Sequence, residues 1–351
     1  MVSVCLPTYN GAAYLHDCLD SVLSQTRADL EVLIVDDGST DATVEIATEA
    51  AARDSRVRIV INGKRYGLAA NWNRCIELAR GEWIKFLFQD DLLAPNCLEA
   101  MVQAAEKARV LFVCCRREFI FEGNVSDEQR EFYFGSSRAI GLFFAQSNPM
   151  PGSRFAISAV ERFRDNLVGE PTATLLHKSI FQKYGSFETD LIMCCDYEFW
   201  NRVASNLGVA YVPEPLATFR VHGRSTSAEN AALRGFRMTQ LDWFIILHNA
   251  LERPAYAALR RVVRAHHGSG FLRRLCEEQA ARALAILESA ERQDPDAARS
   301  CRREWNNVAE LYPLLEKMAA AGRARERLGK AFSPAAWRAL LDRMRRAGAT
   351  T

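Results

Sequence analysis

Two kinds of hydrophobic pattern alternate along the first third of the chain. Short runs of consecutive apolar residues predict strands at positions 2–6, 30–35, 57–61, 83–88 and 110–115. Between them, apolar residues recur every three to four positions, which predicts helices at 12–23, 42–52, 68–79 and 95–108. Strands that are apolar on both faces and joined by helices form parallel sheets. The pattern therefore predicts an α/β fold with a doubly wound, mostly parallel sheet flanked by helices.

The pattern changes near residue 228. From there to the end, almost every segment has a helical pattern rich in Ala, Leu, Arg and Glu, with breaks at proline and glycine positions. We therefore predict an α/β domain over residues 1–228 and an all-helical C-terminal region over residues 229–351.

Composition excludes several classes of protein and reveals a charge asymmetry. The 351 residues are 49% hydrophobic and 25% charged, which excludes disordered and fibrous chains, and a net charge of +2 argues against a nucleic-acid partner. Residues 229–351 nevertheless carry 22 Lys and Arg against 14 Asp and Glu. This surplus fits peripheral docking on an anionic membrane surface. It fits at least as well the solvated faces of a helical bundle or a homodimer interface.

Cysteine usage and the length of the apolar runs indicate a compartment. The ten cysteines include no Cys-x-x-Cys pair, so we expect free thiols in a reducing environment. No basic-then-apolar leader pattern opens the sequence, and the apolar runs are far shorter than the roughly 20 residues of a membrane span. We expect a cytoplasmic protein, located at the inner face of the membrane if the basic helices dock there.

Three polar loops follow the first, second and fourth predicted strands. They occupy positions 7–11, 36–41 and 89–91. Ligands bind beyond the carboxyl ends of parallel strands, and paired carboxylates there favour a divalent cation with a diphosphate. One of these loops alone could be a turn with a helix cap, but three at one sheet edge indicate a site. The G-x-G-x-x-G and P-loop patterns are absent, which disfavours a classical NAD enzyme and a P-loop kinase.

Four segments, taken in order, resemble one known family. They are 2–10 (VSVCLPTYN), 34–41 (IVDDGSTD), 62–82, and 86–91 (FLFQDD). These segments resemble the family 2 glycosyltransferases, which have the GT-A fold, and residues 165–228 are similar to the family more loosely. The resemblance implies a nucleotide-sugar half over about 1–115 and an acceptor half over about 116–228.

The resemblance also implies an activity. Members of this family are metal-dependent, inverting enzymes that use nucleoside-diphosphate sugars. We expect a hexosyltransferase-type enzyme that moves a single sugar from a UDP- or dTDP-type donor, rather than a GDP-type donor. The acceptor would be a hydroxyl of a glycan, glycolipid or other molecule in bacterial polysaccharide, glycolipid or glycoconjugate synthesis.

The resemblance places the donor site on residues that match the family's motifs. The implied nucleotide-sugar contacts are Pro7, Thr8, Tyr9, Asn10, Asp37, Asn71, Asp90 and Arg220. Asp91 and His222 are the implied ligands of Mn²⁺ or Mg²⁺, and Arg224 is an alternative to Arg220 for the phosphates. Gln89 departs from the acidic residue that often begins the metal motif. Arg65 is expected in a surface loop.

An inverting transfer also needs a base for the acceptor hydroxyl. Residues 194–202 resemble the family's acidic helix-start motif, in which Asp196 is the implied base and Glu198 is the alternative. Cys195 stands where Glu is common, so the motif is partial. The simpler interpretation of Asp196 is a helix N-cap.

Two other functions stay open on the sequence. A nucleotidyltransferase would share the nucleotide fold and the metal carboxylates, but it would carry a Gly-rich basic loop after the first strand, and this chain does not. A catalytically degenerate nucleotide-sugar-binding module would explain the departures at Gln89 and Cys195.

Overall fold

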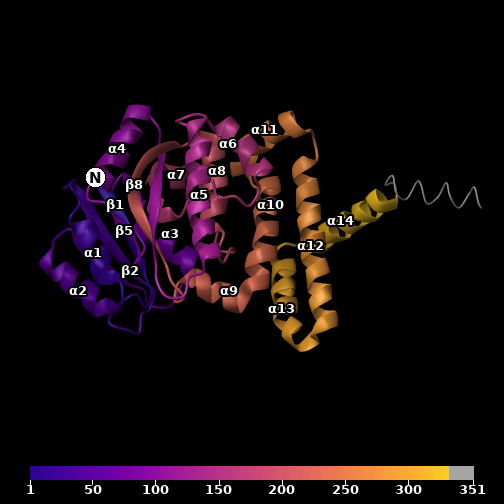
Figure 1. The fold of residues 1–351 in the computed structure, drawn as a ribbon, viewed down its shortest axis with the longest axis horizontal. Helices are drawn as coiled ribbons and strands as arrows, with labels where there is room; N and C mark the ends of the chain where they lie inside the picture. Colours follow the sequence, from indigo (N-terminus) through magenta and orange to yellow (C-terminus); the bar gives the residue numbers. More distant parts are fainter. Residues whose placement is uncertain (332–351) are drawn as a thin grey trace, which may run out of the picture. The chain divides into compact units, whose positions relative to one another are not determined.

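The computed structural model describes residues 1–331, and its first compact unit contains one eight-stranded sheet (Figure 1). The strand order is β3-β2-β1-β4-β7-β6-β8-β5. The strands are β1 (Val2–Thr8), β2 (Leu30–Asp36), β3 (Val57–Ile61), β4 (Trp83–Phe86), β5 (Leu92–Leu93), β6 (Phe112–Phe121), β7 (Thr174–His177) and β8 (Ala210–Val221). β1 pairs in parallel with β2 and β4, and β2 pairs in parallel with β3. The predicted α/β class with a mostly parallel sheet is confirmed.

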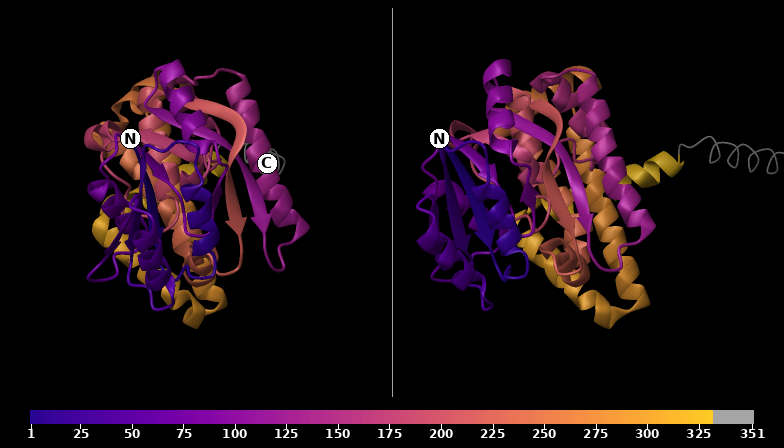
Figure 2. Two further views of the ribbon diagram at one scale, coloured as in Figure 1. Left: turned by 90° about the vertical axis from the view of Figure 1, so that its left-hand side faces the viewer. Right: turned by 60° about the vertical axis from the view of Figure 1, so that its left-hand side comes forward.

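The second half of the sheet differs from a simple parallel continuation. β7 runs antiparallel to both β4 and β6, whereas β6 and β8 form a long parallel pair, visible side by side in magenta and salmon in Figure 2. The register of this pair shifts at Arg116 and Arg117. The predicted fifth strand ended at residue 115, but β6 continues to Phe121, because the bulge lets the chain stay paired through a polar stretch.

Helices cover the sheet and connect its strands. In the first part of the chain they are α1 (Leu15–Leu23), α2 (Thr43–Arg53), α3 (Leu68–Leu78), α4 (Cys97–Ala108), α5 (Asp127–Ala145), α6 (Gly152–Glu161), α7 (Ser179–Tyr184) and α8 (Cys195–Leu207), with a 3₁₀ turn η1 (Pro171–Ala173). In α1 the buried residues are Leu15, Cys18, Leu19 and Val22. Their spacing of three and four positions is the helical period, so α1 buries one face against the core.

The sequence predicted that residues 234–266 all belong to the helical C-terminal region, but the structure divides them between two compact units. One compact unit contains residues 1–233 and 253–266, and the other contains 234–252 and the chain from 267 onward. The returning segment includes η3 (Pro254–Tyr256) and most of α11 (Ala257–His267). The boundary predicted at 228 therefore differs from the structure.

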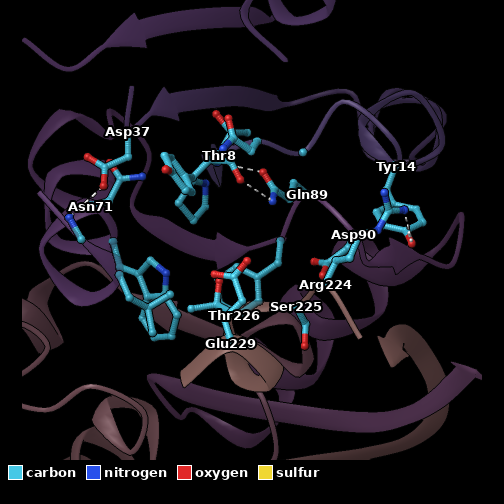
Figure 3. Close-up of a pocket in the computed structure, with 18 of the residues that line it drawn as sticks. Thr8, Tyr14, Asp37, Asn71, Gln89, Asp90, Arg224, Ser225, Thr226 and Glu229 are labelled. Atoms are coloured by element: carbon cyan, nitrogen blue, oxygen red, sulfur yellow. Dashed lines mark hydrogen bonds between the residues drawn. The ribbon is translucent and has the colours of Figure 1, made fainter. Parts of the chain in front are cut away.

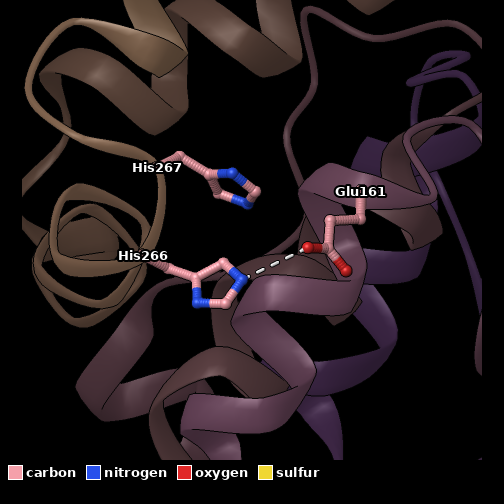
Figure 4. Close-up of side chains that lie close together, drawn as sticks. All are labelled: Glu161, His266 and His267. Carbon is pink, nitrogen blue, oxygen red and sulfur yellow. Dashed lines mark ion pairs between the residues drawn. The ribbon is translucent and has the colours of Figure 1, made fainter.

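Specific contacts hold the returning segment within the first unit. Tyr256 is fully buried, and its hydroxyl donates to Glu198 Oε1 at 2.9 Å. The amide of Asn206 on α8 donates to the carbonyl of Ala255 at 2.8 Å. His266 lies 3.4 Å from Glu161 at the end of α6 (Figure 4). No periodicity in the sequence shows which unit a helix joins, so this return was not predicted.

The second unit is helical. Its segments are η2 (Arg237–Leu241, a π-helical turn), α10 (Asp242–Glu252), α12 (Phe271–Gln293), α13 (Pro295–Leu311) and α14 (Leu314–Ala331), and the chain enters it within α9 (Thr226–Phe236). Three of its arginines pair with glutamates, namely Arg302 with Glu291, Arg323 with Glu288 and Arg325 with Glu277. Membrane docking and dimerisation stay predictions. Among residues 1–331, no helix is both long enough and apolar enough to cross a membrane.

Candidate functional site

A cavity of about 320 Å³ opens in the first unit, where β1, β2 and β4 end (Figure 3). Its wall includes seven predicted nucleotide-sugar contacts and one predicted metal ligand, His222. The seven contacts are Pro7, Thr8, Tyr9, Asn10, Asp37, Asn71 and Asp90. The same cavity is lined by Glu170, Pro171, Met193 and Asp196 from the second half of the sheet domain. The structure therefore brings residues from both predicted halves to one site.

Side-chain hydrogen bonds shape the loop after β2 and join it to the end of β1 and the loop that follows β1. Asp36 accepts from the Thr8 hydroxyl at 2.9 Å and from the N–H groups of Gly38 and Ser39 at 3.1 and 2.9 Å. Asn10 has a φ of +50° and accepts from the Thr40 N–H at 2.8 Å. Thr8 is buried, so its hydroxyl shapes the loop, and only part of the residue borders the cavity.

Gln89, in the loop after β4, clamps the loop after β1. Its Nε2 donates to the carbonyl of Tyr9 at 3.0 Å, and its Oε1 accepts from the Tyr9 N–H at 2.9 Å (Figure 3). A Cβ on Gly11 would lie 2.1 Å from Oε1, so only glycine allows this approach. The clamp needs one donor and one acceptor, which an amide has and a carboxylate lacks. This gives a physical reason for Gln at the position where the family often has an acid.

Gln89→Glu should therefore weaken nucleotide binding although it preserves shape. A carboxylate oxygen would face the Tyr9 carbonyl. The loss of this half-buried hydrogen bond costs about 1–3 kcal/mol, which is roughly 5- to 160-fold in UDP affinity if UDP binds only the intact loop conformation. Calorimetry with UDP measures this. Glu99→Gln, an exchange at a half-buried position of α4 that does not line the cavity, is the control. Unchanged UDP affinity in Gln89→Glu would show that the clamp does not position Tyr9 for the ligand.

Asp37 organises the loop after β3. Its Oδ1 accepts from Asn62 Nδ2 at 3.0 Å and from the Tyr66 N–H at 2.7 Å, and its Oδ2 accepts from the Gly67 N–H at 2.8 Å. Asn71 supports Asn62 through a 2.9 Å hydrogen bond. Asp37 is buried but still reaches the cavity wall.

Arg65 is a cavity residue that the sequence placed in a surface loop. Its guanidinium lies 3.8 Å from the centre of the Tyr9 ring, and both residues line the cavity. A planar cation over an aromatic ring marks a place where a flat, electron-rich ring could also stack. The signal in the sequence was only a basic residue six positions before the nucleotide-contact candidate Asn71, and basic residues are common on surfaces.

The two aspartates of the metal motif point to different places. Asp90 lines the cavity, and its Oδ2 lies 3.0 Å from His222 Nε2. Asp91 is fully buried: its Oδ1 accepts from the Arg220 N–H at 3.0 Å and its Oδ2 from the Thr172 hydroxyl at 2.5 Å. Burial, reinforced by Asp90, raises the pKa of Asp91 well above its usual value. The structure thus places Asp91 behind the site, where the sequence had expected a metal ligand.

The two arginines near His222 also differ. Arg220 is buried, and its Nε donates to the backbone carbonyl of Asp90 at 2.9 Å while its guanidinium pairs with Glu122. It does not line the cavity, so its role here is to hold β8 to the metal-motif loop. Arg224 does line the cavity, next to Tyr14, whose hydroxyl accepts from it at 3.3 Å. The phosphate-contact expectation therefore fits Arg224 better than Arg220.

Asp196 sits in the first turn of α8 and faces the cavity. The N-cap of this helix is Cys194, so the simpler interpretation of Asp196 as the N-cap does not hold. Its Oδ1 accepts from the Tyr197 N–H at 2.7 Å. Burial raises the pKa of Asp196 to about 7, and the nearby Glu170 carboxylate adds to the shift. Its carboxylate can therefore both accept and release a proton near neutral pH.

Glu198, the alternative base, lies on another side of the same helix. It is fully buried, its two oxygens pair with Arg202 at 3.0 and 2.8 Å, and Tyr256 donates to it. Residues two positions apart on a helix point about 200° apart, so Asp196 and Glu198 cannot face the same cavity. The geometry leaves Glu198 without access to a substrate hydroxyl.

Comparisons with known proteins agree with this architecture. The family model described as "Glycosyl transferase family 2" matches residues 3–185. The chain is 29% identical over 252 residues to the uncharacterized protein MT1568 of Mycobacterium tuberculosis, covering 70% of this chain and 76% of that protein. It is 30% identical over 280 residues to the putative glycosyltransferase EpsH of Bacillus subtilis, covering 71% and 75%.

Two solved structures share the fold at low sequence identity. S. aureus TarS 1–349 in complex with UDP-GlcNAc has a TM-score of 0.55 at 15% identity, covering 93% of this chain and 91% of that chain. The mannosyltransferase PcManGT of Pyrobaculum calidifontis, in complex with GDP-Man and Mn²⁺, has a TM-score of 0.54 at 19% identity, covering 92% and 86%.

Proposed function

Because the chain belongs to glycosyl transferase family 2, we propose that it is an inverting glycosyltransferase that moves one sugar from a UDP- or dTDP-type donor to an acceptor hydroxyl. The observation that carries this proposal is the shared cavity. Asp37 and Asp90 line it from the nucleotide half, and Asp196 and His222 line it from the acceptor half. Family membership argues against the nucleotidyltransferase alternative.

In this proposal the acceptor attacks directly. The hydroxyl oxygen of the acceptor bonds to the anomeric carbon of the donor sugar while Asp196 takes the hydroxyl proton. At the same time the bond between the anomeric carbon and the diphosphate oxygen breaks. The nucleoside diphosphate leaves, and the anomeric carbon inverts because attack and departure occur on opposite faces. Arg224 is placed to balance the charge of the departing diphosphate.

The hydrogen bonds of Asp37 support a pyrimidine base. A carboxylate offers about four lone-pair positions, and three N–H groups already occupy Asp37. The remaining position on Oδ2 suits the single N3–H of uracil or thymine. Guanine presents two adjacent N–H groups and would need both oxygens.

The base preference is tested by calorimetry with UDP, dTDP and GDP. An N–H group of guanine that is buried without a hydrogen-bond acceptor costs about 1–3 kcal/mol. UDP or dTDP should therefore bind roughly tenfold or more tightly than GDP. Tighter binding of GDP would contradict the pyrimidine assignment. The absence of binding by all three nucleotides would contradict the proposed function itself.

Asp90 and His222 fit a divalent metal ion. They offer one carboxylate oxygen and one imidazole nitrogen to the same cavity, a donor set that Mn²⁺ accepts readily and Mg²⁺ accepts through the oxygen. When bound there, the ion would neutralise charge on the diphosphate. We assign the metal to these two residues rather than to Asp91, because both Asp91 oxygens accept hydrogen bonds in the buried layer behind the cavity.

The neighbouring aspartates provide a matched pair of variants. Asp90→Asn should lower Mn²⁺ affinity about 10- to 100-fold, the range seen even for groups that only support a ligand. Asp91→Asn should change Mn²⁺ affinity little, because the amide still accepts from the Arg220 N–H and resembles the protonated acid that the raised pKa of Asp91 favours. Electron paramagnetic resonance of free Mn²⁺ measures both. A large loss in Asp91→Asn with normal binding in Asp90→Asn would reverse the assignment.

A further inference from the structure

A buried ion pair supports the cavity wall beside Asp196. Arg117 on β6 is 4% exposed, and its guanidinium pairs with the carboxylate of Glu170. Its NH2 group also donates to the Ser136 hydroxyl on α5 at 3.2 Å. The Glu170 side chain keeps 21% of its surface exposed and lines the cavity. A buried arginine is costly unless it is paired, so this arrangement holds one carboxylate at the cavity surface.

The chain around Glu170 is tied to the helix that carries Asp196. The carbonyl of Gly169 accepts from the indole N–H of Trp200 at 2.9 Å. Asp196 and Trp200 are four positions apart on α8, so they lie on the same face of that helix. Gly169 has a φ of +108°, and a Cβ there would lie 2.8 Å from the Arg117 guanidinium, so the backbone passes directly over Arg117. Glu170 and Asp196 thus line the same cavity from two segments that are tied together by this hydrogen bond.

We propose that Glu170 positions the acceptor sugar. It accepts a hydrogen bond from the group of that sugar that neighbours the hydroxyl deprotonated by Asp196. This inference rests on the proposed function. A carboxylate that pairs with arginine offers only hydrogen-bond acceptors, so its partner on the sugar acceptor must be a hydrogen-bond donor. The acceptor class is therefore a sugar with two adjacent hydroxyls, or with a hydroxyl beside an amide N–H. A sugar with a carboxylate at that place is repelled.

The electrostatics of Asp196 provide a readout that needs no acceptor. The charged groups that act on Asp196 are Glu170, which raises its pKa, and Arg117, which lowers it. Hydrolysis of the nucleotide sugar uses water in place of the acceptor, and its rate should rise with pH as Asp196 ionises, with a midpoint at about 7. Glu170→Gln removes the neighbouring negative charge, so this midpoint should fall by about half a pH unit or more.

Two further variants keep this measurement decisive. Glu118→Gln removes a carboxylate that is next to Arg117 in sequence but 62% exposed, and it should leave the midpoint unchanged. If unpaired Arg117 unfolds Glu170→Gln, the double variant Arg117→Met/Glu170→Gln removes both charges. Its midpoint should still fall, because Glu170 acts on Asp196 more strongly than Arg117 does. A merely structural Glu170 would lower the melting temperature without moving the midpoint.

A panel of 4-nitrophenyl glycosides tests the acceptor class. Hexosides and N-acetylhexosaminides should accept the sugar, whereas the matched glucuronide should not. Glu170→Ala should raise the acceptor KM about tenfold with a smaller change in kcat, and Glu170→Gln should restore part of the loss because its amide oxygen still accepts. Preference for the glucuronide, or an unmoved midpoint in Glu170→Gln, overturns the inference. If no glycoside in the panel accepts the sugar, the pH midpoint of hydrolysis in Glu170→Gln decides whether the inference stands. If the inference fails while these variants still bind UDP normally, only the role of Glu170 is overturned and the proposed function is not.

Discussion

Replacing Asp196 by Asn should lower the turnover of sugar transfer about 10²- to 10⁴-fold, the contribution typical of a positioned general base. Asn keeps the shape of the side chain and still accepts from the Tyr197 N–H, but it cannot take a proton. Donor affinity should stay near that of the parent protein, because Asp196 is not among the residues proposed to contact the donor or the metal. Steady-state kinetics with UDP calorimetry separate the two effects.

Stability provides a second test of Asp196. The folded protein retains the Asp196 proton up to about pH 7, whereas the unfolded chain releases it near 3.8. The folded state therefore binds more protons between these values, so this group destabilises the fold progressively as pH rises through that window. Asp196→Asn has no such cost and should melt at a higher temperature than the parent at pH 8, with little difference at pH 4. Turnover within a few-fold of the parent would mean that another group is the base.

Deleting residues 229–351 should prevent the first unit from folding, although every donor motif precedes that point. The deletion removes Tyr256, whose buried ring and hydroxyl cover the ion pair between Glu198 and Arg202. Tyr256→Ala alone should cost about 3–5 kcal/mol, as for other large buried aromatic residues. The truncated protein should lack a cooperative melting transition.

A graded series separates packing from hydrogen bonding at Tyr256. Tyr256→Phe keeps the ring and should cost only about 1–3 kcal/mol for the unsatisfied carboxylate. Leu142→Ala on α5, where the side chain is 70% exposed, should change stability by less than about 0.5 kcal/mol. A truncated protein that melts cooperatively and binds UDP would show that the returning segment is dispensable.

Strands and connecting helices were predictable where burial alone decides the residue type. β1 and β2 are buried at all seven positions, so their sequences carry no polar alternation. The hydrophobic pattern did not predict β7, because its four residues give too short a run, and its antiparallel direction depends on partners far away in the chain.

The candidate site was predictable in its location but less so in its individual residues. Asp90 and Asp91 are adjacent and chemically identical, and only the fold decides that one faces the cavity and the other faces Thr172. Helical geometry separates Asp196 from Glu198, but the sequence does not show which of the two sides meets the cavity. The clamp by Gln89 depends on the approach of Gly11, a contact across 78 positions.

The interleaved path of the chain has a consequence for its synthesis. The first unit has most of its sheet domain once residue 233 is made, but its last segment ends at residue 266, which is 33 residues later. At about 5–20 residues per second, the ribosome needs roughly 2–7 s to make that stretch. During this interval Glu198 and Arg202 lie uncovered by Tyr256 on the nascent chain. Rare codons between positions 234 and 266 would lengthen the exposure and should lower the soluble yield without altering one residue of the product.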